Sequence, residues 1–529
     1  MAETETETET ETVAEDIPRG WRRFVYATNP RDIGTMFLVF AAAAAAFGGV
    51  AAFRPRAELV APGLQYFAAA HDFAAAVAAH GTAMAFFAAL PAFLGFAYWL
   101  VPLMIGAPSV AFPRLGNFSF WLLPFAFALF LLSLRGTGAD AGWQLFPPFS
   151  VAASPGPAVD FAVAALLMAA LSLLISAVDL IVTVLDMRAP GMTLSKMPLF
   201  VWAVLVAAFL FLVAVPALAG ALSMLVSDRH FGTVFFAGAC GGDPLLFRAL
   251  FWFFAHASGW ALLVGAVGAV GHVISAFSEK PVFGRLGIAY AMIAAALFAL
   301  VGWGPHLAET GLSPSMQAFF MVAAFAALVP AAAMVFSLVA TMWGGAVSFR
   351  APMLWAIGFL PVFAVGALSG LMLAAPGTGT MLRGTMYETA YFHYQFALPL
   401  LFAAFAGFYF WFPKFSGRLY SEFLAKLHFW LAFVGVNLAF FPFYLFGLAG
   451  MPDGVADLPI AFADWNAVAG IGAGLAAVSA LPFLAALVHA FWRGRPAGGN
   501  PWGKGARGLE WTLPSPPPYR TFDDLPSIR

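Results

Sequence analysis

The sequence predicts an all-α integral membrane protein, a bundle of twelve transmembrane helices with both termini in the cytoplasm. Of the 529 residues, 62% are hydrophobic and only 10% are charged, so a water-soluble fold of this chain would have too little polar surface to cover its core. The hydrophobic residues also form twelve stretches of the roughly 20 residues that a helix needs to cross a hydrocarbon layer of about 30 Å. In addition, the basic residues gather in alternate loops, which indicates a fixed orientation in the membrane.

The twelve apolar stretches follow one another along almost the whole chain. We expect each to be a helix, because a helix satisfies its backbone hydrogen bonds internally where no water is available. They begin near Ile33, Gly81, Asn117, Phe161, Leu199, Ala249, Gly287, Met316, Pro352, Tyr387, His428 and Val468.

The basic residues divide unequally between the two sides of this predicted bundle. An even number of spans places both termini on one side, and the loops of that side hold 19 of the 25 Lys and Arg residues. Because basic loops remain cytoplasmic, we expect cytoplasmic termini and a multi-pass protein of the bacterial cytoplasmic (inner) membrane. The opposite loops hold only Arg54, Arg56, Arg135, Arg229, Arg248 and Arg383.

Three parts are expected along the chain. Residues 1–17 are acidic and low in complexity, which is typical of a disordered tail and not of a signal peptide with a basic start. Residues 18–495 form the membrane domain, and residues 496–529 form a cytoplasmic C-terminal tail. The single cysteine, Cys240, excludes an internal disulfide and is expected to be a small apolar filler. A net charge of −1 without a basic face argues against nucleic acid as a partner.

Three histidines lie inside apolar stretches: His80, His256 and His393. An ionisable side chain at membrane depth is costly and by default marks a functional site. Neutral imidazole is a common ligand of haem iron and copper. These residues are therefore candidate metal ligands.

Segments distributed along nearly the whole chain resemble subunit I of the haem-copper oxidases, of the cytochrome c oxidase type. The resemblance implies a low-spin haem and, beside it, a high-spin haem that faces a copper ion, where oxygen is reduced. It also implies subunit II- and III-like partners, a cytochrome c-type or copper electron donor, and surrounding lipid. The matching segments are ATNPRDIG, WLVPLMIGAPSVAFPRLGNFSFWLLP, AGWQLFPPFS, RAPGMTLSKMPLFVW, HVISAFSEKPVFG, AGFYFWFPKFSGRLY, KLHFWLAFVGVNLAFFP and GLEWTLPSPPPY.

The resemblance gives a complete low-spin haem site. His80 of the HGT motif and His393 of the tenth span match the two axial ligands, and Arg56 matches the arginine that contacts the edge of this haem. Two imidazoles leave the iron without a vacant position, which suits electron transfer. A low-spin haem of a- or b-type is therefore expected.

The oxygen site that the resemblance implies is incomplete. The family histidine that ligates the second haem is Tyr391 here. A phenolate can bind ferric haem, so Tyr391 is either a ligand of the second haem or a tyrosine that packs where no second haem binds. Of the copper ligands, His256 and His306 remain and the third position is Pro305. Two imidazoles hold copper less tightly than three, and whether copper and a second haem bind is left open.

Residues that serve oxygen chemistry and proton delivery in the family also differ. The HPEVY motif reads HASGW, so its glutamate is Ser258 and its redox tyrosine is Trp260. No titratable group remains at either channel bottleneck. The substituted channel positions are Tyr98, Ser109, Gly116, Ala331 and Met334.

The outer face changes as well. Arg383 and Gly384 replace the family's outer metal ligands, and Asp453 and Gly454 replace the arginine pair that holds haem propionates. Two acids appear inside spans, Asp179 and Glu388. Glu388 lies one turn from Tyr391 and either exchanges a hydrogen bond or proton with it, or is a partly hydrated acid near the outer interface.

Three functions are compatible with this pattern. The first is a respiratory electron-transfer haem protein that has lost oxygen reduction and proton pumping, a pseudo-oxidase. The second is an active terminal oxidase in which Tyr391 binds the second haem and copper is held by His256 and His306. The third is a haem-free structural subunit or transporter. An optical spectrum with and without carbon monoxide separates them.

Overall fold

The computed structural model describes residues 20–135, 142–151, 156–522 and 524–528. Within these ranges twelve helical segments are long and apolar enough to cross a membrane, which confirms the predicted number. The described residues form helices and loops, with only isolated β-bridges. The expected acidic tail, residues 1–17, lies outside the described residues.

Most crossings consist of one main α-helix. These helices are α3 (Pro30–Glu58), α6 (Pro113–Ser133), α7 (Ala158–Asp186), α8 (Leu199–His230), α9 (Pro244–Phe277), α10 (Arg285–Val301), α11 (Pro314–Met342), α12 (Ala351–Ala374) and α16 (Glu422–Leu448).

The remaining crossings are composite. Two of them contain a π-helical segment, in which the wider turn breaks the regular face of the helix. The first of these two consists of α4 (Ala70–Thr82), the π segment Ala83–Ala89 and α5 (Leu90–Ile105), and the second of α14 (Met386–Phe392), the π segment His393–Ala397 and α15 (Leu398–Ser416). The third composite crossing consists of α17 (Ala463–Val478) followed by α18 (Ala480–Arg493).

Several helices begin with the same local signal, a capping side chain followed by proline. The side chain of Asn29 accepts a hydrogen bond from the backbone N–H of Arg31, and Asp243 accepts one from Leu245, each at the start of a helix whose first residue is proline. A cap satisfies a backbone donor that the helix cannot, and proline lacks the donor that would be unpaired there. These signals fix where α3 and α9 start.

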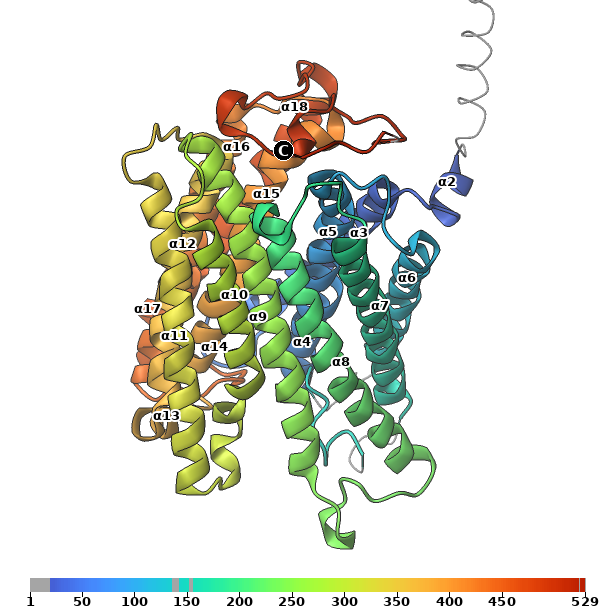
Figure 1. Cartoon of the computed structure of the whole chain (residues 1–529). Helices are drawn as coiled ribbons and strands as arrows, with labels where there is room; N and C mark the ends of the chain where they lie inside the picture. Colours follow the sequence, from blue (N-terminus) through green and yellow to red (C-terminus); the bar gives the residue numbers. More distant parts are fainter. Residues whose placement is uncertain (1–19, 136–141, 152–155, 523, 529) are drawn as a thin grey trace, which may run out of the picture.

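The helices run side by side through the bundle (Figure 1). The short helix α2 (Trp21–Val25) and the C-terminal segment lie at one end, and the short helix α13 (Pro376–Leu382) lies at the other. Close packing depends on small residues: a Cβ added at Gly268 of α9 would lie 2.5 Å from the Cβ of Ala203 on α8. Small residues let two helix backbones approach closely. In a membrane this packing matters because the hydrophobic effect does not drive helices together in hydrocarbon.

The C-terminal segment packs over the terminus-side end of the bundle. The guanidinium of Arg31 donates to the carbonyl oxygens of Pro517 (2.8 Å) and Tyr519 (2.6 Å). The ammonium group of Lys414 donates to the carbonyl oxygens of Gly499 (2.8 Å) and Leu513 (2.7 Å). Two cations thereby hold this segment in addition to its apolar contacts with the core, such as those of Trp502 and Trp511.

Two details of the sequence prediction need correction. The second crossing begins at Ala70, well before the predicted start at Gly81. The prediction missed this part because the polar residues His71 and Asp72 lie in the first turn of the helix. Cys240 is exposed in a short turn between α8 and α9, so the expectation of an apolar filler was wrong.

Candidate haem and metal site

The imidazoles of His80 and His393 are oriented in the same way. Nδ1 of His80 donates to the carbonyl oxygen of Gly48 on α3 (2.9 Å), and Nδ1 of His393 donates to the carbonyl oxygen of Thr389 one turn earlier (2.8 Å). A carbonyl oxygen only accepts, so in each neutral ring Nε2 is left with its lone pair. This is the tautomer and orientation that a metal-ligating histidine needs.

The two histidines belong to one region of the bundle. Trp143 contacts the neighbours of both, because its ring lies 3.3 Å from the Cβ position of Gly81 and 6.2 Å, centroid to centroid, from the ring of Phe392. Both histidines also adjoin π segments: His393 opens one, and the other begins three residues after His80. Such segments often occur at functional sites, and composition gives no signal for them.

Arg56 has donors available for a bound group. Its Nη2 donates to the carbonyl oxygen of Asn466 (2.6 Å), whereas Nε and Nη1 are buried and have no hydrogen-bond partner. An unpaired buried donor is costly. These donors fit the polar substituent of a haem edge. The imidazole of His393 is in turn stacked on Phe440, with centroids 4.0 Å apart.

His256 and His306 meet, as the resemblance implies. Nδ1 of His256 lies 3.3 Å from Nε2 of His306, and the ring of His306 stacks on Trp252 with centroids 4.1 Å apart. Pro305 brings no donor atom to this pair. Among the described residues, His, Cys, Asp and Glu form no group of three or more that could hold a metal ion. The pair therefore offers two ligands where the family uses three.

Tyr391 and Phe396 pack against two different neighbouring helices. The ring of Tyr391 packs on α12 at Gly370, where an added Cβ would lie 2.8 Å from Cε2 of Tyr391. The ring of Phe396 packs on α9 at Gly259, where an added Cβ would lie 2.6 Å from Cε1 of Phe396. The two rings lie 6.3 Å apart, centroid to centroid. Aromatic side chains thus bridge α9 and the π segment directly.

Arg383 and Glu388 interact at the outer end of this region. The side chain of Arg383 is 6% exposed and Nη2 donates to the carbonyl oxygen of Leu373 (2.6 Å). Glu388 is 32% exposed, accepts a hydrogen bond from the backbone of Gly384 (3.1 Å) and lies 3.9 Å from Nη1 of Arg383. It forms no hydrogen bond with Tyr391 among the described residues. These contacts favour the prediction of a partly hydrated acid near the interface over a hydrogen bond with Tyr391, and a proton exchange between the two residues stays a prediction.

Comparison with known proteins identifies the family. A family model for cytochrome c and quinol oxidase polypeptide I matches residues 32–475. The chain belongs to this family. It is 41% identical to cytochrome c oxidase subunit 1 of Cereibacter sphaeroides, over 95% of both chains. A solved heme-copper terminal oxidase dimer matches with a TM-score of 0.73 at 17% identity, over 88% of this chain and 84% of that one, which shows the fold alone.

In this polypeptide I, the substituted channel position Tyr98 forms a hydrogen bond with Asp179, one of the two acids inside the spans. The hydroxyl of Tyr98 on α5 donates to Oδ2 of Asp179 on α7 (3.1 Å), and the backbone N–H of Phe112 donates to Oδ1 (2.8 Å). A Cβ at Gly116 would lie 2.9 Å from Cε1 of Tyr98. Glycine at this position therefore makes room for the phenol ring.

Other residues that replace the family's functional side chains are apolar, or are polar without a hydrogen-bond partner. Ala331 and Met334 are buried, and Trp260 is buried one turn after His256. The hydroxyl of Ser258 is buried and has no hydrogen-bond partner. Sequence reasoning missed the pairing of Tyr98 with Asp179, although a large residue at one channel position and a glycine at another were a signal for it.

Proposed function

We propose that this oxidase subunit I-like chain is a membrane electron-transfer protein that binds one low-spin haem, of a- or b-type, and has lost oxygen reduction and proton pumping. The observation that carries the proposal is a contrast between two sites. The bis-histidine site has correctly oriented ligands and unpaired donors at Arg56. At the oxygen site, the ring of Phe396 lies against the α9 backbone at Gly259.

The residues of the first site each have a definable task. His80 and His393 present Nε2 because their Nδ1–H groups are held by carbonyl oxygens. Stacking on Phe440 fixes the plane of the His393 ring. Arg56 offers two buried donors to the haem edge. Haem between two imidazoles supplies one-electron chemistry at an iron without a free position for oxygen.

The residues of the second site do not fit a second haem. A macrocycle there would have to stand between α9 and the segment that carries Tyr391, and Phe396 already contacts α9 in that space. A phenolate from Tyr391 would also favour ferric iron, whereas oxygen binds ferrous iron. A copper ion would find only His256 and His306, and losing the third imidazole lowers affinity.

Proton delivery is also unsupported by the chain. The hydrogen bond between Tyr98 and Asp179, with the ring of Tyr98 stacked on Phe37 at 5.6 Å, fills one former channel with bonded and aromatic groups. Met334 is buried in the other, and a thioether carries no proton at neutral pH. Reduction of oxygen to water consumes protons, so a buried site without a proton pathway cannot complete this reaction.

We further infer the setting of this protein from its family. The chain works in the bacterial cytoplasmic membrane with subunit II- and III-like partners and takes electrons from a cytochrome c-type or copper donor at the outer face. The support is its membership in the family and its similarity to cytochrome c oxidase subunit 1 over almost its full length.

The test is the reduced-minus-oxidised optical spectrum of the purified protein. We expect one low-spin haem band, lost in His80→Ala and in His393→Ala and kept in His71→Ala, which changes an exposed histidine outside the site. A wild-type protein without any haem band would contradict the proposal and favour a structural subunit or transporter.

The second candidate function is an active terminal oxidase, favoured by the 3.3 Å approach of His256 to His306. In that case Tyr391 would ligate the second haem. Oxygen uptake with reduced cytochrome c decides between the two. Uptake that disappears in His256→Ala would establish the oxidase, whereas we expect none above the background of membranes that lack the protein.

A further inference from the structure

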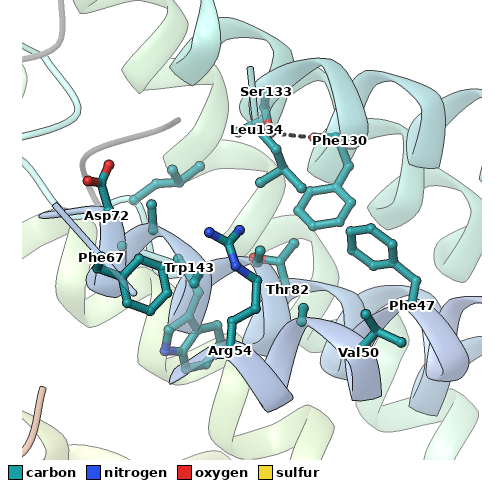
Figure 2. A pocket seen from close by; sticks show the side chains of 18 of the residues that line it. Phe47, Val50, Arg54, Phe67, Asp72, Thr82, Phe130, Ser133, Leu134 and Trp143 are labelled. Carbon is teal, nitrogen blue, oxygen red and sulfur yellow. Dashed lines mark hydrogen bonds between the residues drawn. The ribbon is translucent and has the colours of Figure 1, made fainter. Parts of the chain in front are cut away.

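A cavity of about 640 Å³ opens among four helices at the end of the bundle opposite the termini (Figure 2). Its walls come from the C-terminal parts of α3 and α6, the length of α4, the N-terminal part of α7 and two loops that contribute residues 66–68 and 142–145. The volume lies within the range of roughly 300–1,000 Å³ that is usual for small-molecule sites. The lining includes neither His80 nor His393, and Trp143, which contacts Gly81, forms part of the wall.

The walls of the cavity are mostly apolar. Aromatic and aliphatic side chains from α3, α6, α7 and two loops line it, together with a row of alanines on α4. Alanine leaves the helix surface open and so creates the space. The apolar wall includes Phe47, Phe67, Phe130, Leu145 and Leu166.

One cation projects into this apolar space. Figure 2 shows the guanidinium of Arg54 in the middle of the cavity, and its carbon lies 5.0 Å from the centre of the Phe67 ring. Arg54 makes no hydrogen bond or ion pair with any residue of the described chain, and it is exposed. Asp72 is the acid on the rim, and its carboxylate lies 3.1 Å from Nε2 of His71. The charge of Arg54 is therefore available to a ligand.

The depth of Arg54 indicates which anions can reach it. Arg54 lies in the last turns of α3, close to the end of the apolar span at Glu58. Long basic side chains at such positions extend toward the headgroup layer. A guanidinium at this level can pair with the phosphate of a phospholipid headgroup through charge-assisted hydrogen bonds. A soluble anion would gain nothing from the apolar walls.

We propose that this cavity is a binding site for one anionic phospholipid of the outer leaflet. The phosphate pairs with the guanidinium of Arg54, and an acyl chain lies along Phe47, Phe130 and the alanines of α4. The site is independent of the proposed haem function, because it shares none of the haem ligands.

The test compares lipid binding to variants of the full chain in detergent, measured by native mass spectrometry with added phosphatidylglycerol or phosphatidylcholine. We expect the wild type to prefer phosphatidylglycerol, and Arg54→Ala to reduce that preference about fivefold, the loss expected when one exposed ion pair worth about 1 kcal/mol is removed. Arg54→Lys should retain most of it. Ala78→Phe fills the cavity and should abolish retention of both lipids, whereas Ala74→Phe, on an exposed face of α4 outside the lining, should not.

Circular dichroism establishes that each variant is folded before binding is compared. Equal binding by Arg54→Ala and wild type would overturn the proposal, as would equal effects of Ala78→Phe and Ala74→Phe. Displacement of the lipid by inorganic phosphate would show a site for a free anion and not for a lipid. Recovery of a neutral amphiphile, such as an isoprenoid quinone, in place of the phospholipid would also overturn it.

Discussion

Phe396 contacts α9 at Gly259 so closely that a Cβ at position 259 would lie 2.6 Å from Cε1 of the ring. Gly259 stands where the family motif HPEVY has valine, and it is flanked by Ser258 and Trp260, which replace the motif's glutamate and tyrosine. A bulky ring on one element and a glycine on the other are complementary in shape. Under the proposed function, this contact occupies space that a second haem would need.

Gly259→Val should destabilise the protein. Two added methyl groups and a Cβ would meet the Phe396 ring, and overpacking of this kind costs about 1–3 kcal/mol. Thermal unfolding in detergent should show a lower midpoint, and Phe396→Ala in the same chain should restore it. Gly220→Val on α8 is the control, because nothing lies within 4 Å of its Cβ position. A Gly259→Val midpoint equal to that of the control would show that the contact is not tight.

Arg56→Gln should lower the reduction potential of the bound haem. A buried cation favours the reduced iron, which carries one positive charge fewer. If the interaction is worth about 1.4 kcal/mol, the potential should fall by about 60 mV in a potentiometric titration. Arg135→Gln, at an exposed arginine on the same side, should leave it unchanged. A potential that rises in Arg56→Gln would mean that the guanidinium does not face the haem.

Tyr98→Phe should destabilise the bundle without changing its haem content. The phenylalanine keeps the stacking on Phe37 but withdraws a donor from the buried carboxylate of Asp179, a loss of about 1–3 kcal/mol. The control is Tyr66→Phe, since Tyr66 is exposed and its hydroxyl donates no hydrogen bond to a described residue. Equal unfolding midpoints for the two variants would show that the pairing of Tyr98 with Asp179 is not a stabilising contact.

Stability should fall between about pH 4.5 and pH 7 through Glu510. Burial raises the pKa of this carboxyl from 4.5 to about 7, although the nearby charge of Lys414 opposes the shift. Because the folded-state pKa is the higher one, the folded protein binds more protons than the unfolded chain in this window, and stability declines as pH rises, levelling off above about pH 7.

Glu510→Gln should remove most of this slope. At pH 8 the variant should unfold at a higher temperature than the wild type. The corresponding gain in the free energy of unfolding should be on the order of 3 kcal/mol at most. Unfolding midpoints measured from pH 5 to pH 8 provide the test, with Glu422→Gln as the control at a carboxyl that is partly exposed. An unchanged slope in Glu510→Gln would place the origin of the pH dependence elsewhere.

The fold was predictable because hydropathy and loop charge act over whole segments. Twelve crossings follow from stretches of about 20 apolar residues, whatever their internal geometry. The π segments at Ala83–Ala89 and His393–Ala397 were not predictable in this way, because one wider turn leaves composition and average periodicity almost unchanged.

At the candidate site, the motifs pointed to side chains whose surroundings are compatible with haem binding, which stays a prediction. Nδ1 of His80 and of His393 donates to a backbone carbonyl oxygen, and two buried donors of Arg56 have no partner. Helical spacing alone left two environments open for Glu388, because it carries no information on the attraction of Arg383 or the backbone donor at Gly384. The hydrogen bond from Tyr98 to Asp179 joins residues 81 positions apart, which no local pattern encodes.

The carbon monoxide difference spectrum of the reduced, purified protein, taken with a copper analysis of the same sample, tests the loss of oxygen chemistry most directly. We predict a single low-spin haem whose spectrum does not change on addition of carbon monoxide, and far less than one copper per chain. A high-spin haem that binds carbon monoxide reversibly, together with about one copper per chain, would contradict the proposed function.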